Sequence, residues 1–242
     1  MRCFALLALV LAVAWPAQAA ESPSPPAAEC AFVLHGFGRG PRSMRSLAQR
    51  LSRAGYTVYN VDYPSMREDF PRLVGRLAAE VDSEAPGCST VHFVGYSLGA
   101  LLVRDYLGRH AVPKLGRVVM IGPPNHGSEI VDSLGAGWLM RRLLGPVASR
   151  LGTSKDSIPN QLGRPDFPLG VIAGDRIISP LGWLLLPRPH DGTVSVTSAR
   201  LDGMTDFLLV HRSHTFMIES REIADQTIAF LRHGRFERHA SG

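Results

Sequence analysis

The sequence is poor in the features that mark membrane, nucleic-acid-binding and metal-binding proteins. Beyond the N-terminal stretch, no apolar run approaches the roughly 18 residues of a membrane-spanning helix. Lys and Arg number 26 against 21 Asp and Glu, and no basic run is interleaved with aromatic residues, so binding to nucleic acid is not predicted. No two histidines lie at i and i+4 beside an acidic residue, so we expect no metal site, and no motif indicates another cofactor.

The chain has 242 residues, of which 45% are apolar, and we find no internal repeat. This length suits one well-filled domain and is too short for two domains of ordinary size. We therefore expect a single domain over residues 30–235, followed by a C-terminal tail over residues 236–242.

The N-terminus has the pattern of a secretory signal peptide. Arg2 supplies the positive charge, Cys3 to Trp15 form the apolar stretch, and Ala17-Gln18-Ala19 is a small-residue cleavage site. Residues 20–29 are rich in Pro, Ser and Ala and are typical of a linker. The sequence thus predicts a signal peptide over residues 1–19 and a protein that is secreted or periplasmic.

Strand-like and helix-like segments alternate along the rest of the chain. The expected strands are Ala31–Leu34, Thr57–Val61, Val91–Val94, Arg117–Ile121, Leu169–Ala173 and Phe207–Val210. The expected helices between and after them are Arg42–Ala54, Asp69–Glu84, Leu98–Leu107 and Glu222–Leu231. This alternation predicts an α/β fold with a mostly parallel sheet and helices on both faces, and the near-continuous apolar strands fit burial on both sides.

Gly95-Tyr96-Ser97-Leu98-Gly99 matches the G-x-S-x-G pattern of a serine nucleophile. In that pattern a tight turn from strand to helix lifts the serine out of the sheet, and small residues on both sides let the backbone pass. The expected strand and helix lie on the correct sides here. The alternative is an ordinary turn in which Ser97 caps the helix.

His35-Gly36-Phe37-Gly38, which follows the first expected strand, is a candidate oxyanion loop. Acyl transfer builds negative charge on a carbonyl oxygen, and fixed backbone N–H groups stabilise that charge. The usual donors are the residue after the nucleophile and a residue of a loop after an early strand. This assigns the amides of Leu98 and Phe37, although a plain glycine-rich turn would look similar.

An acid and a histidine should follow the nucleophile in that order. His211 and His214 both lie between the last strand and the last helix, and we favour His214 because His211 is only one residue past the strand. Asp191 and Asp175 both follow the Leu169–Ala173 strand. Spacing alone does not decide between these two acids, and Asp191 could also belong to a structural Asp-Gly turn.

Together these motifs resemble the lipase and esterase branch of the α/β-hydrolases, including bacterial lipases and inositol-deacylase-like proteins. The resemblance is carried by His35–Gly38, Gly95–Gly99, Gly122–Ser128, Asp191–Val194 and Ser213–Thr215, and it spans almost the whole chain after the linker. It implies a compact α/β-hydrolase with apolar, lid-like insertions. It also implies Asp191 rather than Asp175 as the acid, because family members commonly carry it on an Asp-Gly-x-Val segment.

The resemblance implies a serine hydrolase that cleaves carboxylic esters, with a lipid or other hydrophobic acyl ester as the substrate. Ser97, Asp191 and His214 would form its triad, and the reaction would pass through an acyl-enzyme intermediate. Because fold and triad do not identify the substrate, a thioesterase, an amidase, an acyltransferase and a non-catalytic binding protein on this fold remain alternatives.

Two long segments interrupt the alternation of strands and helices, and loops of this length are often functional. Ser128 to Phe167 contains a helix candidate, Trp138–Leu151, with an apolar face made of Trp138, Leu139, Met140, Leu143 and Leu144. Ile177 to Pro189 contains a second apolar stretch, Trp183 to Leu186. Around Ser97 they would form an acyl pocket or a lid that could contact a lipid interface, and the alternative is core packing beneath long loops.

Of the three cysteines, Cys30 and Cys88 lie outside the expected signal peptide. Each lies just before one of the two strands that lead to His35 and to Ser97. In α/β-hydrolases these strands are neighbours, about 4.8 Å apart, and a disulfide needs Cα atoms roughly 4.4–6.8 Å apart. The resemblance and an oxidising compartment therefore predict a Cys30–Cys88 disulfide, with two buried free thiols as the alternative.

Overall fold

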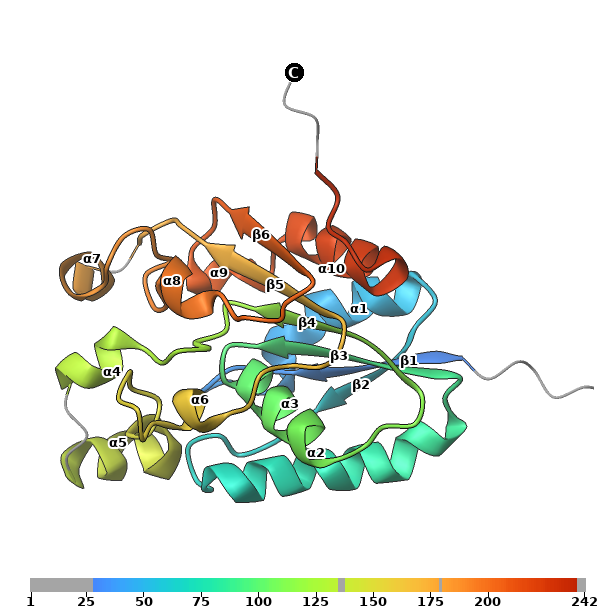
Figure 1. Cartoon of the computed structure of the whole chain (residues 1–242), viewed down its shortest axis with the longest axis horizontal. Coiled ribbons are helices and arrows are strands. Elements are labelled where there is room, and N and C mark those ends of the chain that lie inside the picture. Colours follow the sequence, from blue (N-terminus) through green and yellow to red (C-terminus); the bar gives the residue numbers. More distant parts are fainter. Residues whose placement is uncertain (1–27, 135–137, 179, 239–242) are drawn as a thin grey trace, which may run out of the picture.

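The computed structural model describes residues 28–134, 138–178 and 180–238 (Figure 1). Within them, six strands form one sheet in the spatial order β2-β1-β3-β4-β5-β6, and every neighbouring pair is parallel. The strands are β1 (Glu29–Leu34), β2 (Thr57–Val61), β3 (Thr90–Tyr96), β4 (Leu115–Ile121), β5 (Leu169–Gly174) and β6 (Asp206–Val210). This sheet confirms the predicted α/β fold.

Helices connect the strands and cover the sheet. Those that follow the predicted pattern are α1 (Arg45–Arg53), α2 (Phe70–Glu84), α3 (Leu98–Arg109) and α10 (Arg221–His233), with short 3-10 helices η1 (Pro41–Met44) and η2 (Ala85–Gly87). The remaining helices are α4 (Glu129–Leu134), α5 (Trp138–Ala148), α6 (Ile158–Gln161), α7 (Pro180–Leu185), α8 (Val196–Ala199) and α9 (His214–Met217). Among the described residues, no helix has both the length and the apolar character that crossing a membrane requires.

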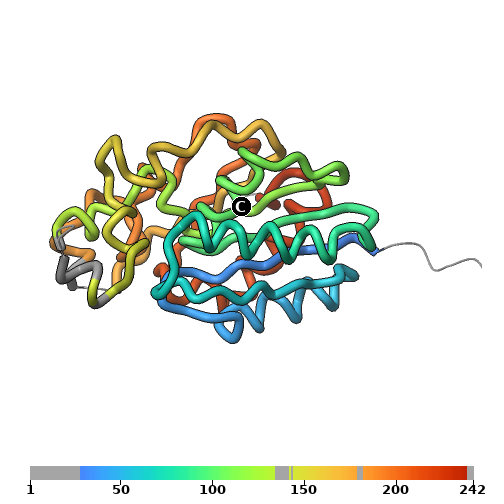
Figure 2. The backbone as a smooth tube through the Cα atoms, turned by 90° about the horizontal axis from the view of Figure 1, so that it is seen from below, coloured from blue at the N-terminus to red at the C-terminus, as the bar shows by residue number. Residues whose placement is uncertain are grey.

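Both faces of the sheet are buried, because alternate residues of a strand point to opposite faces. Phe32 and Leu34 of β1 belong to a core cluster that includes the apolar residues of α2 and α3. Ala31 and Val33 belong to a second cluster with residues of α1 and α10. Figure 2 shows α1 and α2 on opposite sides of β1. Burial on both faces is the reason that the strands are almost continuously apolar.

The start of α2 illustrates how local sequence sets the helix boundaries. The carboxylate of Asp69 accepts a hydrogen bond from the Arg72 N–H at 3.0 Å. Pro71 occupies the first turn, where its missing N–H leaves no hydrogen bond unmade. Leu73 and Leu77, four residues apart, then face the sheet and are buried.

Two insertions leave the sheet at its carboxyl edge. The segment from β4 to β5 carries α4, α5 and α6, and the segment from β5 to β6 carries α7 and α8. Figure 1 shows α4, α5 and α7 beyond the arrowheads of the strands. The helix predicted over Trp138–Leu151 ends at Ala148 and is kinked at Gly145, whose φ is 84° and which precedes Pro146. Proline lacks the N–H that a continuous helix needs, which accounts for the kink.

The chain packs onto the sheet beyond α10. Phe236, at the start of the segment expected as a tail, is buried with its ring centroid 5.0 Å from that of Phe230. Its N–H donates to the carboxylate of Asp206 at 2.8 Å. These contacts join the residues after α10 to the edge strand β6.

Cys30 and Cys88 form a disulfide, with their Cα atoms 5.7 Å apart. Cys30 lies in β1 and Cys88 precedes β3, and β1 and β3 are hydrogen-bonded neighbours. Both sulfurs are therefore at the amino edge of the sheet, opposite to the edge that carries the insertions. Both residues are buried in the cluster beneath α2.

Removing the disulfide should lower the free energy of unfolding by about 2–5 kcal/mol, because a cross-link between distant residues restricts the unfolded chain. The two cysteines are 58 positions apart. Urea unfolding would compare the oxidised protein, the same protein with a reductant, and the variant Cys30→Ala/Cys88→Ala. We expect lower midpoints for the last two samples, and three equal midpoints would contradict the prediction.

Candidate active site

Ser97 occupies the turn between β3 and α3 in a backbone conformation that side chains rarely adopt. Its φ is 53°, and in the described segments it is the only residue other than glycine with a positive φ. A Cβ on Gly95 would lie 2.5 Å from the Cα of Ala100, and one on Gly99 would lie 2.7 Å from the His35 carbonyl oxygen. Only glycine fits at these two positions, so the G-x-S-x-G pattern reflects packing around a strained serine.

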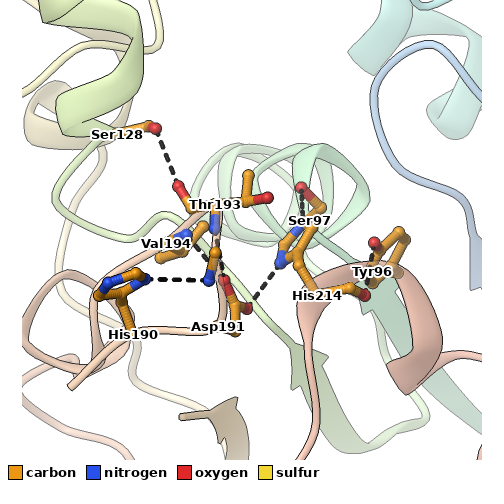
Figure 3. A network of polar contacts seen from close by, with 9 residues as sticks. Tyr96, Ser97, Ser128, His190, Asp191, Thr193, Val194 and His214 are labelled. Carbon is orange, nitrogen blue, oxygen red and sulfur yellow. Dashed lines mark hydrogen bonds and ion pairs between the residues drawn. The ribbon is translucent and has the colours of Figure 1, made fainter. Parts of the chain in front are cut away.

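His214 joins Ser97 to Asp191 through a chain of hydrogen bonds (Figure 3). The Nε2 atom of His214 lies 3.1 Å from the Ser97 Oγ, and its Nδ1 atom lies 2.7 Å from Oδ2 of Asp191. His214 is 8% exposed and Asp191 is 2% exposed. An ionised carboxylate only accepts hydrogen bonds, so the network places a proton on Nδ1 and leaves Nε2 free to accept the serine proton.

The Asp191 carboxylate is held by its own loop. Its Oδ1 atom accepts hydrogen bonds from the N–H groups of Thr193 and Val194, at 2.9 and 2.8 Å. The His214 N–H donates to the Asp191 carbonyl oxygen at 2.9 Å. His190, which precedes Asp191, accepts the Gly192 N–H at its Nδ1 atom at 3.1 Å. Burial lowers the pKa of His190. The acid and the imidazole are thus aligned by backbone as well as side-chain contacts.

Asp175 and His211, the alternatives to Asp191 and His214, pair with each other. Asp175 Oδ1 lies 2.8 Å from His211 Nδ1, and the side chains are 30% and 78% exposed. The structure therefore brings Ser97, His214 and Asp191 together, and places Asp175 and His211 in a separate pair that faces solvent.

The loop with Phe37 lies directly against the serine. A Cβ on Gly36 would be 3.2 Å from the Ser97 Cβ and 2.8 Å from the Tyr96 ring. Within the described residues, the Phe37 N–H has no acceptor. Leu98 opens α3, and first-turn N–H groups have no partner within their own helix. Both amides expected to form an oxyanion hole are thus beside Ser97 and available.

Tyr96 is a site residue whose role the sequence did not predict. Its hydroxyl donates a hydrogen bond to the His214 carbonyl oxygen at 2.9 Å, and the two ring centroids are 5.0 Å apart. Burial raises the pKa of Tyr96, so the hydroxyl stays protonated and remains a donor. The only local signal was its place in the variable position before the serine, which does not reveal a contact with a residue more than a hundred positions away.

An apolar cavity of about 170 Å³ opens beside Ser97. It is lined by the oxyanion loop, by the first insertion and by the acid loop, through Phe37, Ser97, Pro124, Ser128, Ile130, Val131, Leu144, Ala148, Leu151, Thr193 and Val194. Of the predicted lid face, Leu144 lines the cavity. The side chains of Trp138, Leu139, Met140 and Leu143 lie outside the described part of the structure.

The second insertion presents apolar side chains to solvent next to the acid loop. A Cβ on Gly182 would lie 2.5 Å from the Gly192 carbonyl oxygen, which places α7 directly against that loop. Trp183 and Leu184 of α7 are 61% and 72% exposed. The guanidinium of Arg188 lies 5.7 Å from the centre of the Trp183 ring. In the described ranges, no group of three or more His, Cys, Asp or Glu residues is arranged to hold a metal ion.

Known proteins share sequence and fold with this chain. Residues 31–235 match the profile of the family described as "Alpha/beta hydrolase family". The chain is 36% identical over 162 residues to a triacylglycerol lipase of Pseudomonas fragi, a match that covers 65% of the chain and only 55% of the lipase.

Two solved structures share the fold at low identity. The mature form of the Bacillus licheniformis lipase BlEst2 has a TM-score of 0.66 and 22% identity, over 88% of this chain and 94% of that one. The metagenomic carboxyl esterase MGS0156 has a TM-score of 0.58 and 18% identity, over 81% of this chain and 68% of that one.

The hydrogen-bond chain predicts that Ser97 is a nucleophile whose reactivity depends on His214 and Asp191. A fluorophosphonate probe should label Ser97, and His214→Ala and Asp191→Asn should slow labelling by roughly 10³-fold or more, because the serine loses its base or the base loses its tautomer. Labelling rates followed by peptide mapping provide the measurement.

His211→Ala and Asp175→Asn are matched controls, because they alter a second His–Asp pair that does not contact Ser97. We expect near wild-type labelling in both. A larger loss in the controls than in the first two variants would transfer the roles of base and acid to the exposed pair.

Proposed function

Because the chain belongs to the alpha/beta hydrolase family, we propose that it is a serine hydrolase of the lipase and esterase type that cleaves carboxylic esters with hydrophobic acyl groups. The proposal is carried by the hydrogen-bond chain Asp191–His214–Ser97, which lies beside an apolar cavity. A nucleophile, its base, a carboxylate and free amides are the groups that acyl transfer requires.

In the first half of the proposed reaction, the Ser97 Oγ attacks the ester carbonyl carbon and His214 Nε2 takes the hydroxyl proton. The carbonyl π electrons move to the oxygen, where the Phe37 and Leu98 N–H groups stabilise the negative charge. Asp191 accepts the Nδ1 hydrogen bond and stabilises the imidazolium. The carbonyl then re-forms as the bond to the alcohol oxygen breaks, and His214 gives the proton it took from Ser97 to the leaving alcohol.

In the second half, water replaces the alcohol. His214 takes a proton from the water while the water oxygen attacks the acyl carbon. The same two amides stabilise the second oxyanion. The bond to Ser97 Oγ then breaks, the proton returns to the serine, and the carboxylic acid leaves. The proton leaves Ser97 and later returns to it across the Ser97–His214 distance of 3.1 Å, which is within the range for proton transfer.

The cavity supports a hydrophobic acyl group as the recognised part of the substrate. Its lining is almost entirely apolar, so an alkyl chain loses contact with water on binding without leaving a polar group unpaired. The similarity to a triacylglycerol lipase supports an ester as the bond that is cleaved. Thioester, amide or acyl-transfer chemistry would use the same triad, and a non-catalytic binding protein would show none of these reactions.

We further assign the protein to an oxidising location outside the cytoplasm. The Cys30–Cys88 disulfide supports this assignment, because such bonds persist in secreted and periplasmic proteins. The proposed signal peptide over residues 1–19 lies outside the described residues.

A series of p-nitrophenyl esters tests the proposed reaction and its acyl group. A cavity of about 150 Å³ holds benzene, so one of about 170 Å³ should be filled by an acyl chain of roughly six carbons. Up to that length, each buried methylene should raise kcat/KM about fourfold, from about 0.8 kcal/mol of transfer free energy. Leu151→Ala should move the optimum to longer chains, because Leu151 lines the cavity.

Two serine variants complete the test. Ser97→Ala should lower kcat/KM at least roughly 10⁴-fold, whereas Ser83→Ala, at an exposed serine of α2, should leave it unchanged. Thioester and amide analogues of the best ester should be cleaved more slowly. Absence of hydrolysis of every ester by the wild type, or wild-type rates in Ser97→Ala, would refute the proposal.

The exposed side chains of α7 support contact with a lipid interface. Trp183 and Leu184 present apolar surface next to the acid loop, and Arg188 adds a positive charge beside the tryptophan. Aromatic and aliphatic side chains with neighbouring basic groups are typical of segments that rest on anionic lipid surfaces. A substrate held in such an interface would then meet the cavity from the side of the insertions.

Trp183→Gln/Leu184→Gln should weaken binding to vesicles of phosphatidylcholine and phosphatidylglycerol several-fold and should lower hydrolysis of an emulsified ester. Hydrolysis of soluble p-nitrophenyl butyrate should stay near the wild-type rate. Leu209→Gln is the control, because Leu209 is an exposed leucine of the edge strand β6. Co-sedimentation with vesicles measures binding, and equal effects of both variants would contradict a specific role for α7.

A further inference from the structure

The segment that follows β2 packs against the loop that carries the Phe37 amide. Tyr63 is 3% exposed, and its hydroxyl donates a hydrogen bond to the His35 carbonyl oxygen. The Tyr63 ring also stacks on the His35 imidazole, with centroids 4.0 Å apart and planes inclined by 10°. His35 is itself fully buried. One end of the loop is therefore held through both a carbonyl oxygen and a side chain.

Ser65 holds the other end of the same loop. Its side chain is buried, with the residue 3% exposed, and its Oγ accepts a hydrogen bond from the Gly38 N–H at 3.0 Å. The Ser65 N–H donates to the Tyr63 carbonyl oxygen at 2.9 Å, so the two anchoring residues are tied to each other. The His35 carbonyl and the Gly38 amide, which these residues hold, flank the peptide unit that presents the Phe37 N–H.

The loop also contacts the nucleophile turn. Gly36 lies against the Tyr96 ring and the Ser97 Cβ, where a side chain on Gly36 would clash. The loop therefore contacts Tyr96 and Ser97 as well as Tyr63 and Ser65. A glycine-rich loop has little conformational preference of its own, whereas an oxyanion donor must lie 2.7–3.1 Å from the developing charge.

We propose that Tyr63 and Ser65 are positioning residues that hold the Phe37 N–H at the geometry the oxyanion requires. The inference rests on the proposed ester hydrolysis and adds two residues outside the triad and the oxyanion donors. Neither side chain reaches the reacting atoms. Each acts by fixing one end of the loop, and the effect is realised in the transition state, when charge develops on the carbonyl oxygen.

The same segment connects the loop to the first insertion. Met66 follows Ser65, and a Cβ on Gly145 would lie 1.9 Å from the Met66 carbonyl oxygen. The kink of α5 therefore packs against the segment that contacts the oxyanion loop. The segment from Tyr63 to Met66 therefore contacts both the loop that carries the Phe37 N–H and the helix that lines the cavity. It would fix the position of the carbonyl oxygen relative to that of the acyl chain.

Tyr63→Phe and Ser65→Ala test the proposal, because each removes a single polar group. With p-nitrophenyl butyrate, each variant should lower kcat roughly tenfold or more, less than the 10²–10³-fold loss of a whole donor, and KM should stay within about twofold. The inhibition constant of an alkylboronic acid, whose serine adduct is tetrahedral, should rise by the same factor as kcat/KM falls. Ser65→Thr retains the Oγ acceptor and should restore most of the activity.

Tyr59→Phe is the matched control, because Tyr59 lies on β2 and stacks on Phe32, away from the loop. It should leave kcat and the boronic acid constant unchanged. Urea unfolding identifies variants that fail to fold, and if Tyr63→Phe does not fold then Ser65→Ala and Ser65→Thr decide the question.

Unchanged kcat in folded Tyr63→Phe and Ser65→Ala would overturn the proposal. A loss confined to KM, with boronic acid inhibition unaltered, would also overturn it, because that result describes a merely structural role. A wild type that neither hydrolyses esters nor labels at Ser97 would refute the proposed function and this inference with it.

Discussion

The turn at Ser97 is the constraint on which the rest of the site depends. A positive φ at a serine costs about 1–3 kcal/mol and persists because its surroundings leave no alternative. The Ser97 N–H donates to the Ile121 carbonyl oxygen of β4 at 2.9 Å, and the flanking glycines pack against backbone. This arrangement aims the hydroxyl out of the sheet, toward the His214 imidazole.

The sheet then brings distant segments to that hydroxyl. In a parallel sheet all carboxyl ends meet at one edge, so the loops after β1, β3, β5 and β6 converge there. Phe37, Asp191 and His214 arrive on three of these loops, while the disulfide joins two strands at the opposite edge. The disulfide and the residues of the candidate active site therefore lie at opposite ends of the same strands. The insertions, which extend beyond the carboxyl ends, supply the apolar cavity.

Much of this organisation could be predicted, and the failures are informative. Six strands and the serine turn were predicted because each follows from a short pattern of apolar, small and β-branched residues. The helix expected over Trp138–Leu151 was too long, since Gly145 and Pro146 interrupt it. Spacing could not choose between Asp191 and Asp175, because both follow β5 and only the path of the insertion decides which carboxylate turns inward.

By itself, the sequence determined the order of strands and helices, the nucleophile turn and the resemblance to lipases and esterases, because all of these depend on residues that are close along the chain. The tertiary structure decided which imidazole reaches Ser97, 117 positions away, and which carboxylate reaches that imidazole, 23 positions away. It also decided that Tyr63 and Ser65 hold the Phe37 loop and which side chains line the cavity. Those contacts depend on how helices and strands pack together, and no local pattern encodes them.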